Sequence, residues 1–300
     1  MATLYTHQDE NIAKTWILMT GFLLVVVGIG WGISYYFNNP GILVFAVVFS
    51  ILTNIWAYWS SDKLVIAMSG AKPAPAAQYP DLNNVVENLA ITAGLPKPKV
   101  YVIDDPAPNA FATGRNKEHA AVAVTSGLLQ IMDKTELEGV LAHELSHIGN
   151  RDMLVSTIAV VLVGFVTLAS DFFLRSTLFG AGGRDREERG NPVLMIIAVA
   201  FIVLSPIVAT LIQLAISRKR EFLADASGAL LTRYPEGLAN ALRKIGNYTQ
   251  PMRRANNATA HLYISNPFGA KAAMSGIARL FMTHPPIDER IKALLDTGVQ

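Results

Sequence analysis

Three residues in one short stretch have the types and spacing to bind and use a metal ion. His143, Glu144 and His147 form an H-E-x-x-H pattern. Histidines four positions apart lie on one face of a helix, so both imidazoles can reach one ion, and Zn²⁺ suits this pair. Glu144 projects about 100° round the helix from His143 and borders that face. It can therefore hold a water beside the ion and act as a general base.

The segment from Thr135 to Asp152 has the signals of a helix that would present these side chains. Thr135 is a good N-cap residue, and Glu138 three positions later completes a predicted capping box. Gly149 and Asn150 are natural C-cap residues. Apolar residues recur every four positions and form a stripe away from the histidines, at Leu137, Leu141 and Leu145. The less favoured alternative is two surface histidines on either side of a helical glutamate.

A catalytic zinc site needs a third protein ligand, and a later acidic pair can supply it. Glu221 and Asp225 are four positions apart and share one face of a predicted helix. Glu221 would bind the metal, and Asp225 would accept the other ring N–H of a ligand histidine and fix its tautomer. The alternative is a solvated carboxylate pair near the basic residues that follow an apolar segment, Arg218, Lys219 and Arg220.

The composition indicates an integral membrane protein. Apolar residues make up 51% of the 300 residues and charged residues only 16%, and the apolar residues are concentrated in blocks. The net charge of +2 is too small to indicate a nucleic-acid partner. Because the chain has no cysteine, disulfides and thiolate metal sites are excluded, and zinc must be bound by histidine and carboxylate.

Four apolar segments are long enough to cross a bilayer, which takes about 20 residues. They are residues 16–37, 42–59, 153–174 and 193–216. A turn at 38–41 joins the first two into a predicted hairpin, for which a buried soluble hairpin is the alternative. The first segment is not a signal peptide, because its apolar run exceeds the usual length of about 7–15 residues and no cleavage pattern follows. Residues 175–191 are polar and glycine-rich, which predicts a mobile loop.

The remaining residues predict a domain with a small sheet. A proline-containing linker, an amphipathic helix and a short helical link are expected at residues 60–77, 80–93 and 126–132. Strands are expected at residues 99–103, 109–112 and 119–125. The chain thus divides into an N-terminal hairpin, a first part of the catalytic domain, a second transmembrane pair and a helical second part of that domain. These four parts are residues 1–60, 61–152, 153–216 and 217–300.

The apolar segments limit where the metal site can lie. His147 is six residues before the third segment, and Glu221 is five residues after the fourth. These connections reach about 10–20 Å, so we expect the site close to one membrane face. Lysines and arginines on that side, against an uncharged turn in the first hairpin, make it cytoplasmic by the positive-inside rule, and both termini with it. The loop at 175–191 argues against this orientation, because it would lie on the opposite side of the membrane and carries four arginines.

Five short motifs lie along most of the chain, and the apolar segments fall between them. They are PNAFATG at 108–114, HELSH at 143–147, NRD at 150–152, REFLAD at 220–225 and THPP at 283–286. In this order they resemble the HtpX family of bacterial membrane metalloproteases, which are related to the CAAX prenyl proteases. The resemblance implies a stress-linked endopeptidase for membrane-protein quality control in the bacterial inner membrane. Membrane proteins or peptides would be its substrates.

By the same resemblance, His143, His147 and Glu221 are ligands of one Zn²⁺ ion. Glu144 is then the catalytic base. The implied fold is a mainly α integral membrane protein: four transmembrane helices plus a cytoplasmic α+β zincin-like (gluzincin) catalytic domain with a small β-sheet.

Two further assignments rest on the resemblance alone. The strand with Asn109, Ala110, Phe111 and Ala112 would be an edge strand whose backbone pairs with an extended substrate, although a plain structural edge is the alternative. His284 would stabilise the oxyanion, although a capping role before a proline is equally open. The remaining isolated histidines, His119 and His261, are interpreted as structural.

Three other functions would also use an H-E-x-x-H pattern in a membrane protein. An intramembrane protease is rejected, because polar residues and not an apolar run flank the H-E-x-x-H pattern. A CAAX-type prenyl-protein protease stays an alternative enzyme. A non-enzymatic, zinc-stabilised membrane scaffold also stays open, because a fourth protein ligand such as His284 would close the site.

Overall fold

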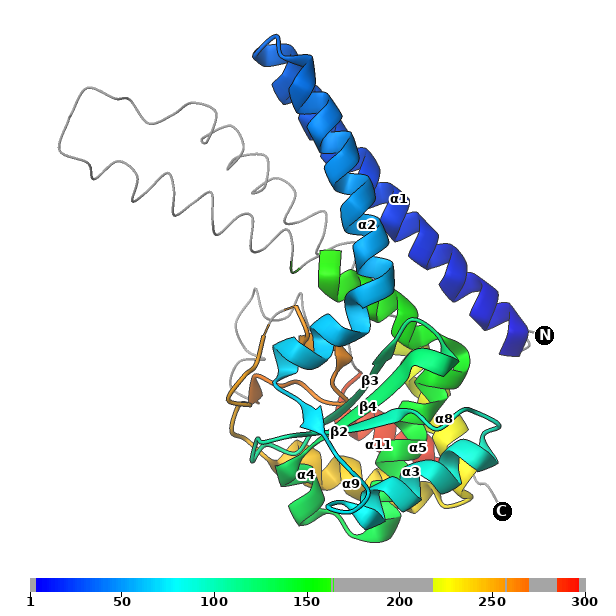
Figure 1. Cartoon of the computed structure of the whole chain (residues 1–300). Coiled ribbons are helices and arrows are strands. Elements are labelled where there is room, and N and C mark those ends of the chain that lie inside the picture. The colour runs from blue at the N-terminus through cyan, green and yellow to red at the C-terminus, as the bar shows by residue number, and fades with distance from the viewer. Residues whose placement is uncertain (1–3, 163, 165–217, 257, 270–284, 297–300) are drawn as a thin grey trace, which may run out of the picture.

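Two long helices rise from a body built of a small sheet and shorter helices (Figure 1). The computed structural model describes residues 4–162, 164, 218–256, 258–269 and 285–296. Several predictions fall outside these residues and concern the fourth apolar segment, most of the third, the loop at 175–191 and His284.

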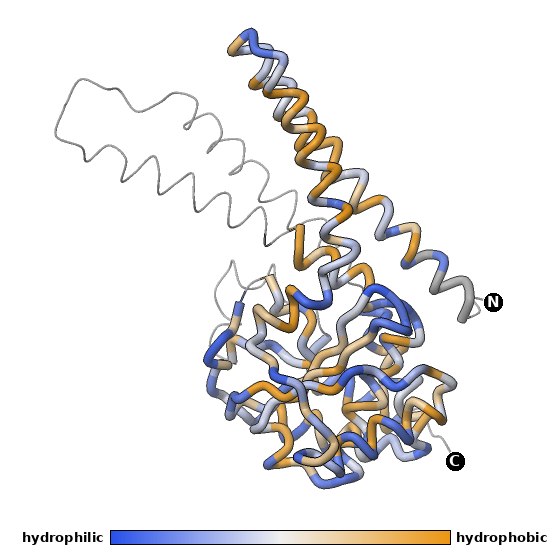
Figure 2. Tube along the Cα trace, in the orientation of Figure 1, coloured by the Kyte–Doolittle hydropathy of each residue, from blue (hydrophilic) through white to orange (hydrophobic). Residues whose placement is uncertain are grey.

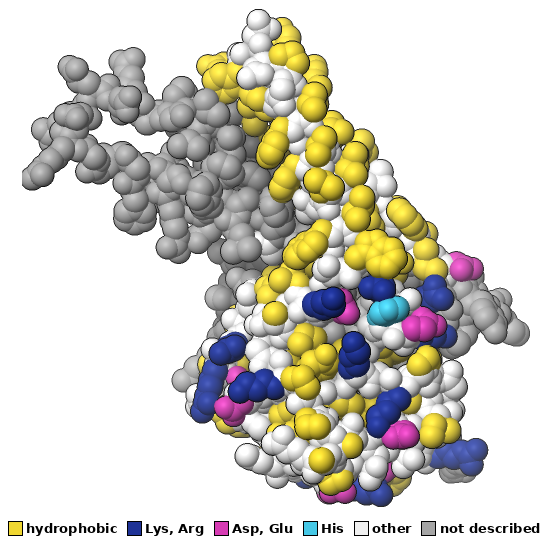
Figure 3. Space-filling model, in the orientation of Figure 1, with side chains coloured by type: hydrophobic (Ala, Val, Ile, Leu, Met, Phe, Trp, Pro, Cys, Tyr) yellow, Lys and Arg dark blue, Asp and Glu magenta, His cyan; other side chains and the backbone are white. Residues whose placement is uncertain are grey.

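The hairpin consists of α1 (Leu4–Tyr36) and α2 (Pro40–Ser69), which pack along each other. Asn39 caps the start of α2, because its side chain accepts a hydrogen bond from the Gly41 N–H at 3.0 Å. Both helices are long and apolar enough to cross a membrane, over Asn11–Tyr36 and over all of α2. The hydropathy along the trace is high over much of both helices (Figure 2), and many of their large apolar side chains are exposed, whereas charged side chains gather on the body (Figure 3). Such a surface is typical of a hairpin in lipid.

The predicted linker at 60–77 is wrong in its first half. The helix α2 continues to Ser69, because residues 61–69 contain no helix breaker and end in a second apolar run. Gly70 then ends the helix with a φ of 68°, which favours glycine. Lys72–Pro73 forms β1 at the edge of the sheet, where a proline is tolerated.

The sheet has four strands in the order β1-β2-β4-β3. Besides β1, they are β2 (Lys99–Ile103), β3 (Ala110–Gly114) and β4 (Ala120–Thr125), close to the three strands that the sequence predicts. The central pair β2 and β4 is parallel, and the outer strands β1 and β3 are antiparallel to their neighbours. The strand β3 therefore lies at a sheet edge, as predicted.

Shorter helices cover the sheet. They are α3 (Pro80–Thr92), α4 (Ser126–Ile131), α5 (Lys134–Asn150), α8 (Arg218–Thr232), α9 (Pro235–Asn247) and α11 (Ile287–Asp296), with 3₁₀ turns η1 (Lys117–His119) and η3 (Ala260–Leu262). A further apolar helix, Asp152–Leu162, follows α5. The helix α5 packs against α8, α9 and β3, so it holds the centre of the body.

Alternate residues of β4 point into two different cores. Val122 belongs to an apolar cluster with α3, α5 and α9, whereas Ala123 belongs to a second cluster with the hairpin and the helix Asp152–Leu162. Phe111 is fully buried in this second cluster, edge-on to Tyr263 at 5.1 Å between ring centroids. The sheet therefore joins the α5 layer to the membrane hairpin.

The helix α5 is present as predicted, but its caps lie elsewhere. Asp133, not Thr135, is the N-cap: its carboxylate accepts from the Glu136 N–H at 2.9 Å, and the Glu136 carboxylate accepts from the Asp133 N–H at 2.9 Å. A carboxylate at this position satisfies free amide groups of the first turn and suits the helix dipole. At the other end, Arg151 is the C-cap with a φ of 58°. The predicted stripe is confirmed, because the side chains are buried at Leu137, Leu141 and Leu145.

Candidate active site

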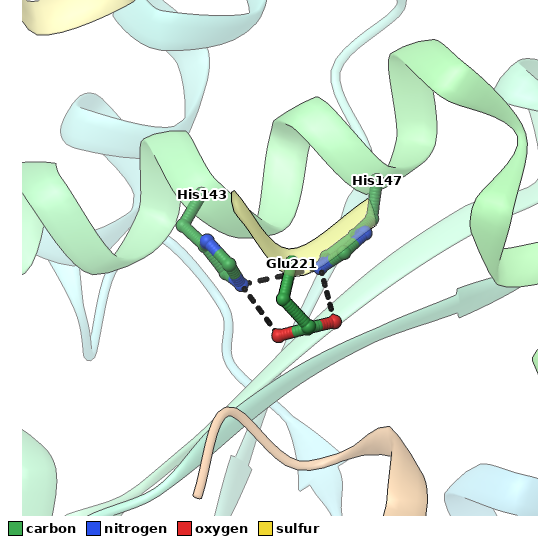
Figure 4. A group of neighbouring side chains, drawn as sticks. All are labelled: His143, His147 and Glu221. Atoms are coloured by element: carbon green, nitrogen blue, oxygen red, sulfur yellow. Dashed lines mark hydrogen bonds and ion pairs between the residues drawn. The ribbon is translucent and has the colours of Figure 1, made fainter. Parts of the chain in front are cut away.

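Three side chains from two helices converge at the surface of α5 (Figure 4). His143 and His147 come from α5, and Glu221 comes from the first turn of α8. The two Nε2 atoms are 3.1 Å apart, and the Glu221 oxygens lie 3.8 Å from His143 Nε2 and 3.6 Å from His147 Nε2. Two ligand atoms bound about 2.1 Å from a tetrahedral ion lie roughly 3.4 Å apart, so this set fits a zinc-sized ion.

A glycine allows α8 to come close enough to deliver Glu221. A Cβ at Gly228 would lie 2.9 Å from the backbone nitrogen of His143 and 3.2 Å from the carbonyl carbon of Ala142. The backbones of α5 and α8 therefore touch at this point, two turns along α8 from Glu221. Any larger residue there would separate the carboxylate from the imidazoles.

Carboxylates behind the imidazoles fix how the rings face. His143 Nδ1 lies 2.9 Å from Asp225 Oδ1, and His147 Nδ1 lies 3.2 Å from Asp152 Oδ2. Each ring therefore donates its Nδ1–H to a carboxylate and turns Nε2 toward Glu221. This arrangement favours the metal-binding tautomer and makes the rings better ligands.

The two histidines differ in charge before any metal binds. Burial lowers the pKa of His143 to about 4, so this ring is neutral at pH 7. Burial also lowers the pKa of His147, but the hydrogen bond to Asp152 and the charges of Glu221 and Asp152 outweigh it and raise the pKa to about 9. A metal ion must therefore displace a proton from His147.

Glu144 is 2% exposed and lies beside the three converging groups. Burial raises the pKa of Glu144 to about 7, although the charge of His147 and a hydrogen bond from the Ala112 backbone N–H oppose this change. A carboxyl group whose pKa is near 7 can both accept and return a proton at neutral pH. This is the property that a general base needs.

Asp225 is itself hydrogen-bonded by a residue for which the sequence gave no functional signal. Arg290 of α11 is fully buried and donates two hydrogen bonds to the Asp225 carboxylate, at 2.8 and 2.7 Å. It donates a third bond to the Ile264 carbonyl oxygen at 3.0 Å. The guanidinium lowers the pKa of Asp225, against the effect of burial, and keeps the partner of His143 ionised.

The predicted edge strand reaches the site at one residue. Ala112 lines the cavity with Glu144 and the converging groups. The Ala110 carbonyl oxygen accepts a hydrogen bond from the Ile264 N–H at 2.9 Å, and the Asn109 side chain donates to the Ser265 carbonyl oxygen at 3.0 Å. Residues 109 and 110 are therefore tied to the segment at 264–265, whereas Ala112 is the residue of this strand that lines the cavity.

The two histidines interpreted as structural differ in position. His119 is exposed and makes a 2.7 Å contact from Nδ1 to the Asn116 side chain. His261 is buried and lines the cavity, with Nε2 3.2 Å from the Ser156 carbonyl oxygen. His261 belongs to no motif, so the sequence did not predict that it lines the cavity. Asp152 had one signal, the NRD motif directly after the H-E-x-x-H pattern, but no role was assigned to it.

Comparison with known proteins agrees with the expected family. The profile of peptidase family M48 matches residues 76–297. The chain is 48% identical over 297 residues to a protein named "Protease HtpX homolog" from Caldanaerobacter subterraneus subsp. tengcongensis, covering 97% of both chains. The homologue of Dictyoglomus turgidum is 44% identical, over 99% of this chain and 95% of its own.

A solved structure shares the fold. The chain superposes on the crystal structure of S. mikatae Ste24p with a TM-score of 0.50 and 19% identity, covering 94% of this chain and 67% of that one. At this identity the similarity concerns the fold alone. The sequence relatives cover nearly the whole chain and the family profile covers residues 76–297, and on their basis the chain belongs to peptidase family M48, as a membrane metalloprotease of the HtpX type.

Proposed function

We propose that the protein is a zinc-dependent endopeptidase that cleaves misfolded membrane proteins at the cytoplasmic face of the bacterial inner membrane. One observation carries this proposal: two Nε2 atoms and the Glu221 carboxylate converge within 4.8 Å beside a buried glutamate that is not one of the three. A closed structural zinc site has no need of such a glutamate, so Glu144 favours an enzyme over a scaffold.

The chain's own residues divide the chemical work. His143, His147 and Glu221 would hold one Zn²⁺ ion, which when bound polarises the peptide carbonyl and lowers the pKa of water. Glu144 takes a proton from the attacking water and passes it to the leaving amine. Asp225 and Asp152 keep the two imidazoles oriented throughout.

Substrate contacts follow from the edge of the sheet. We assign the strand segment of Asn109, Ala110, Phe111 and Ala112 to substrate binding, with backbone pairing centred on Ala112 because that residue lines the cavity. His284 would donate to the oxyanion of the tetrahedral intermediate.

The membrane arrangement belongs to the same proposal. Four spans, at residues 16–37, 42–59, 153–174 and 193–216, would divide the chain into the four parts named above. The hairpin supports the first two spans, and the apolar helix Asp152–Leu162, which starts two residues after α5 ends, supports the third. The termini and the catalytic body would then be cytoplasmic. A site so close to the bilayer would meet loops of damaged membrane proteins first.

Cleavage by protein purified in detergent tests the enzyme assignment. Casein and a reconstituted membrane protein serve as substrates, with and without a chelator. We expect zinc-dependent cleavage, and we expect Glu144→Gln to keep zinc while losing about 10²–10⁴-fold in rate, the usual contribution of a general base. Glu138→Gln is the matched control, because Glu138 is on the same helix, has a partly exposed side chain and lies 4.0 Å from Lys134.

Zinc content tests the third ligand separately. Glu221→Gln should lose zinc as well as activity. Full activity of metal-loaded Glu144→Gln would show that Glu144 is not the general base. Unchanged zinc content in Glu221→Gln would show that another residue is the third ligand.

A further inference from the structure

An asparagine in the first membrane helix reaches the back of the metal site. Asn11 of α1 is 2% exposed, although it lies more than 120 positions before the H-E-x-x-H helix. Its Nδ2 donates to Asp152 Oδ1 at 2.7 Å and to the Asn150 carbonyl oxygen at 3.0 Å. Its Oδ1 accepts from Arg220 Nη1 at 3.1 Å. The N-terminal end of α1 descends beside the body to make these contacts (Figure 1).

These contacts determine how Asp152 faces His147. One carboxylate oxygen, Oδ2, is 3.2 Å from His147 Nδ1, and the other, Oδ1, takes the short bond from Asn11. A carboxylate held at one oxygen cannot rotate without breaking that bond, so its second oxygen stays in line with the imidazole. Asn11 therefore restrains a group that orients a proposed metal ligand.

The same side chain also touches the segment that carries the third ligand. Arg220 directly precedes Glu221 on α8, and its Nη1 lies between the Asn11 side chain and Asp152 Oδ1, at 3.1 and 3.5 Å. The amide of Asn11 thus contacts both the end of α5 and the start of α8. These are the two elements whose relative position brings Glu221 to the imidazoles.

We propose that Asn11 is a positioning residue, through which α1 stabilises the metal-bound arrangement of His147 and Glu221. The helix α1 is then part of the catalytic site's support as well as a membrane anchor. This inference rests on the proposed function, because it takes His147 and Glu221 to be metal ligands. A simpler role, in which Asn11 only fills a buried polar site, predicts a loss of fold stability without a specific loss of metal.

Metal retention in detergent separates the two roles, because an anchor has no function there. Purified zinc-loaded protein is mixed with excess chelator, and the rate of zinc loss is followed. Residues directly behind metal ligands change metal affinity by about 10–100-fold, and Asn11 is one contact further away, so we expect Asn11→Leu to release zinc about 3–10-fold faster. Leucine keeps the branching and the number of side-chain heavy atoms and removes every hydrogen bond of the side chain.

A matched control lies in the same hairpin. Asn54 of α2 is 7% exposed and donates to the Met19 carbonyl oxygen of α1 at 3.2 Å, so it also joins this helix to a neighbour through an amide. Met19 is about 12 Å along α1 from Asn11. Asn54→Leu should therefore release zinc at the rate of the unmodified protein. Equal acceleration by both variants would indicate general loosening of the hairpin and would overturn the inference.

A double-variant comparison tests the route through Asp152. If Asn11 acts by holding Asp152, then Asn11→Leu should change zinc release by less than about twofold in an Asp152→Ala background. A full 3–10-fold effect in that background would show that Asn11 acts independently of Asp152 and would overturn the route through Asp152.

The unmodified protein gives a third test, which does not depend on a variant that folds. Coupling between two sites is reciprocal, so zinc binding should slow hydrogen exchange of the α1 backbone around Asn11 and leave the far end of the hairpin unchanged. Exchange around Asn11 that zinc does not alter would contradict the inference. A protein that binds no zinc would overturn the proposed function itself, whereas normal zinc release by Asn11→Leu would overturn the role of Asn11 alone.

Discussion

Replacing Glu144 with glutamine should stabilise the metal-free protein at alkaline pH, although it removes the proposed general base. Glu144 is 2% exposed, and burial raises its pKa from an ordinary 4.5 to about 7. Below pH 4.5 the carboxyl group is protonated in both the folded and the unfolded chain, so it does not change the free energy of unfolding. Between pH 4.5 and about 7 the unfolded chain ionises this carboxyl group while the folded protein keeps it protonated, so the free energy of unfolding falls over this range and levels off above it.

The size of this loss follows from the two pKa values. The difference between about 7 and 4.5, at about 1.36 kcal/mol per pH unit, corresponds to roughly 3 kcal/mol of unfolding free energy above pH 8. Glutamine has nearly the same shape and does not ionise. The free-energy gap between Glu144→Gln and the unmodified protein should therefore widen by about this amount from pH 4.5 to pH 8.

Unfolding of chelator-treated protein in mixed micelles measures this gap at pH 5 and at pH 8.5. Glu138→Gln serves as the control, since Glu138 lies on the same helix with its side chain 35% exposed. We expect the control to differ little from the unmodified protein at either pH. A gap between Glu144→Gln and the unmodified protein that does not change with pH would refute the reasoning, because it would mean that Glu144 ionises as readily in the fold as in the unfolded chain.

Three further predictions concern metal binding. Asp152→Ala should weaken zinc binding about 10–100-fold by releasing the His147 ring, as measured by competition with a chromogenic chelator; an unchanged affinity would show that Asp152 does not orient the ring. Because His147 has a pKa of about 9 without metal, zinc affinity should rise about tenfold per pH unit between pH 6 and pH 8 and level off above 9, and a flat profile in the same assay would contradict the proton competition. Gly228→Ala should cost about 1–3 kcal/mol and lower zinc content, because its Cβ would push α8 from the backbone of His143 and carry Glu221 away; normal zinc content by metal analysis would show that α8 can adjust.

The sequence predicts the groups that converge on the site, because their signals are local. Two imidazoles four positions apart on a helix, and a carboxylate pair on another, carry their chemistry in their spacing. The predicted contact of Asp225 with a ligand histidine has its counterpart in the 2.9 Å distance to His143. The apolar hairpin could also be predicted, because the hydropathy of about 20 consecutive residues identifies a candidate span without tertiary information.

The supporting contacts could not be predicted, because they join residues far apart in the chain. Arg290 meets Asp225 across 65 positions, and Asn11 meets Asp152 across 141. Each is an ordinary polar residue of a helix, and only the fold gives it a buried partner. His261 is the same kind of case: nothing around it in the sequence places it in the cavity.

The errors at element ends have local causes. Asp133 competes with Thr135 for the start of α5, and the carboxylate prevails because it also accepts from the Thr135 hydroxyl at 2.7 Å. The helix α2 passes its expected end at Trp59 because a second apolar run follows about one polar turn, and Gly70 ends it. In both cases the first plausible signal in the sequence was not the one that the structure uses.

The position of zinc in a crystal of the metal-loaded protein tests the central claim most directly. Anomalous diffraction at the zinc edge should show one strong peak within about 2.0–2.2 Å of His143 Nε2, His147 Nε2 and a carboxylate oxygen of Glu221. A peak bound by other residues, or a peak on the two imidazoles with Glu221 turned away and replaced by another protein ligand, would contradict the account.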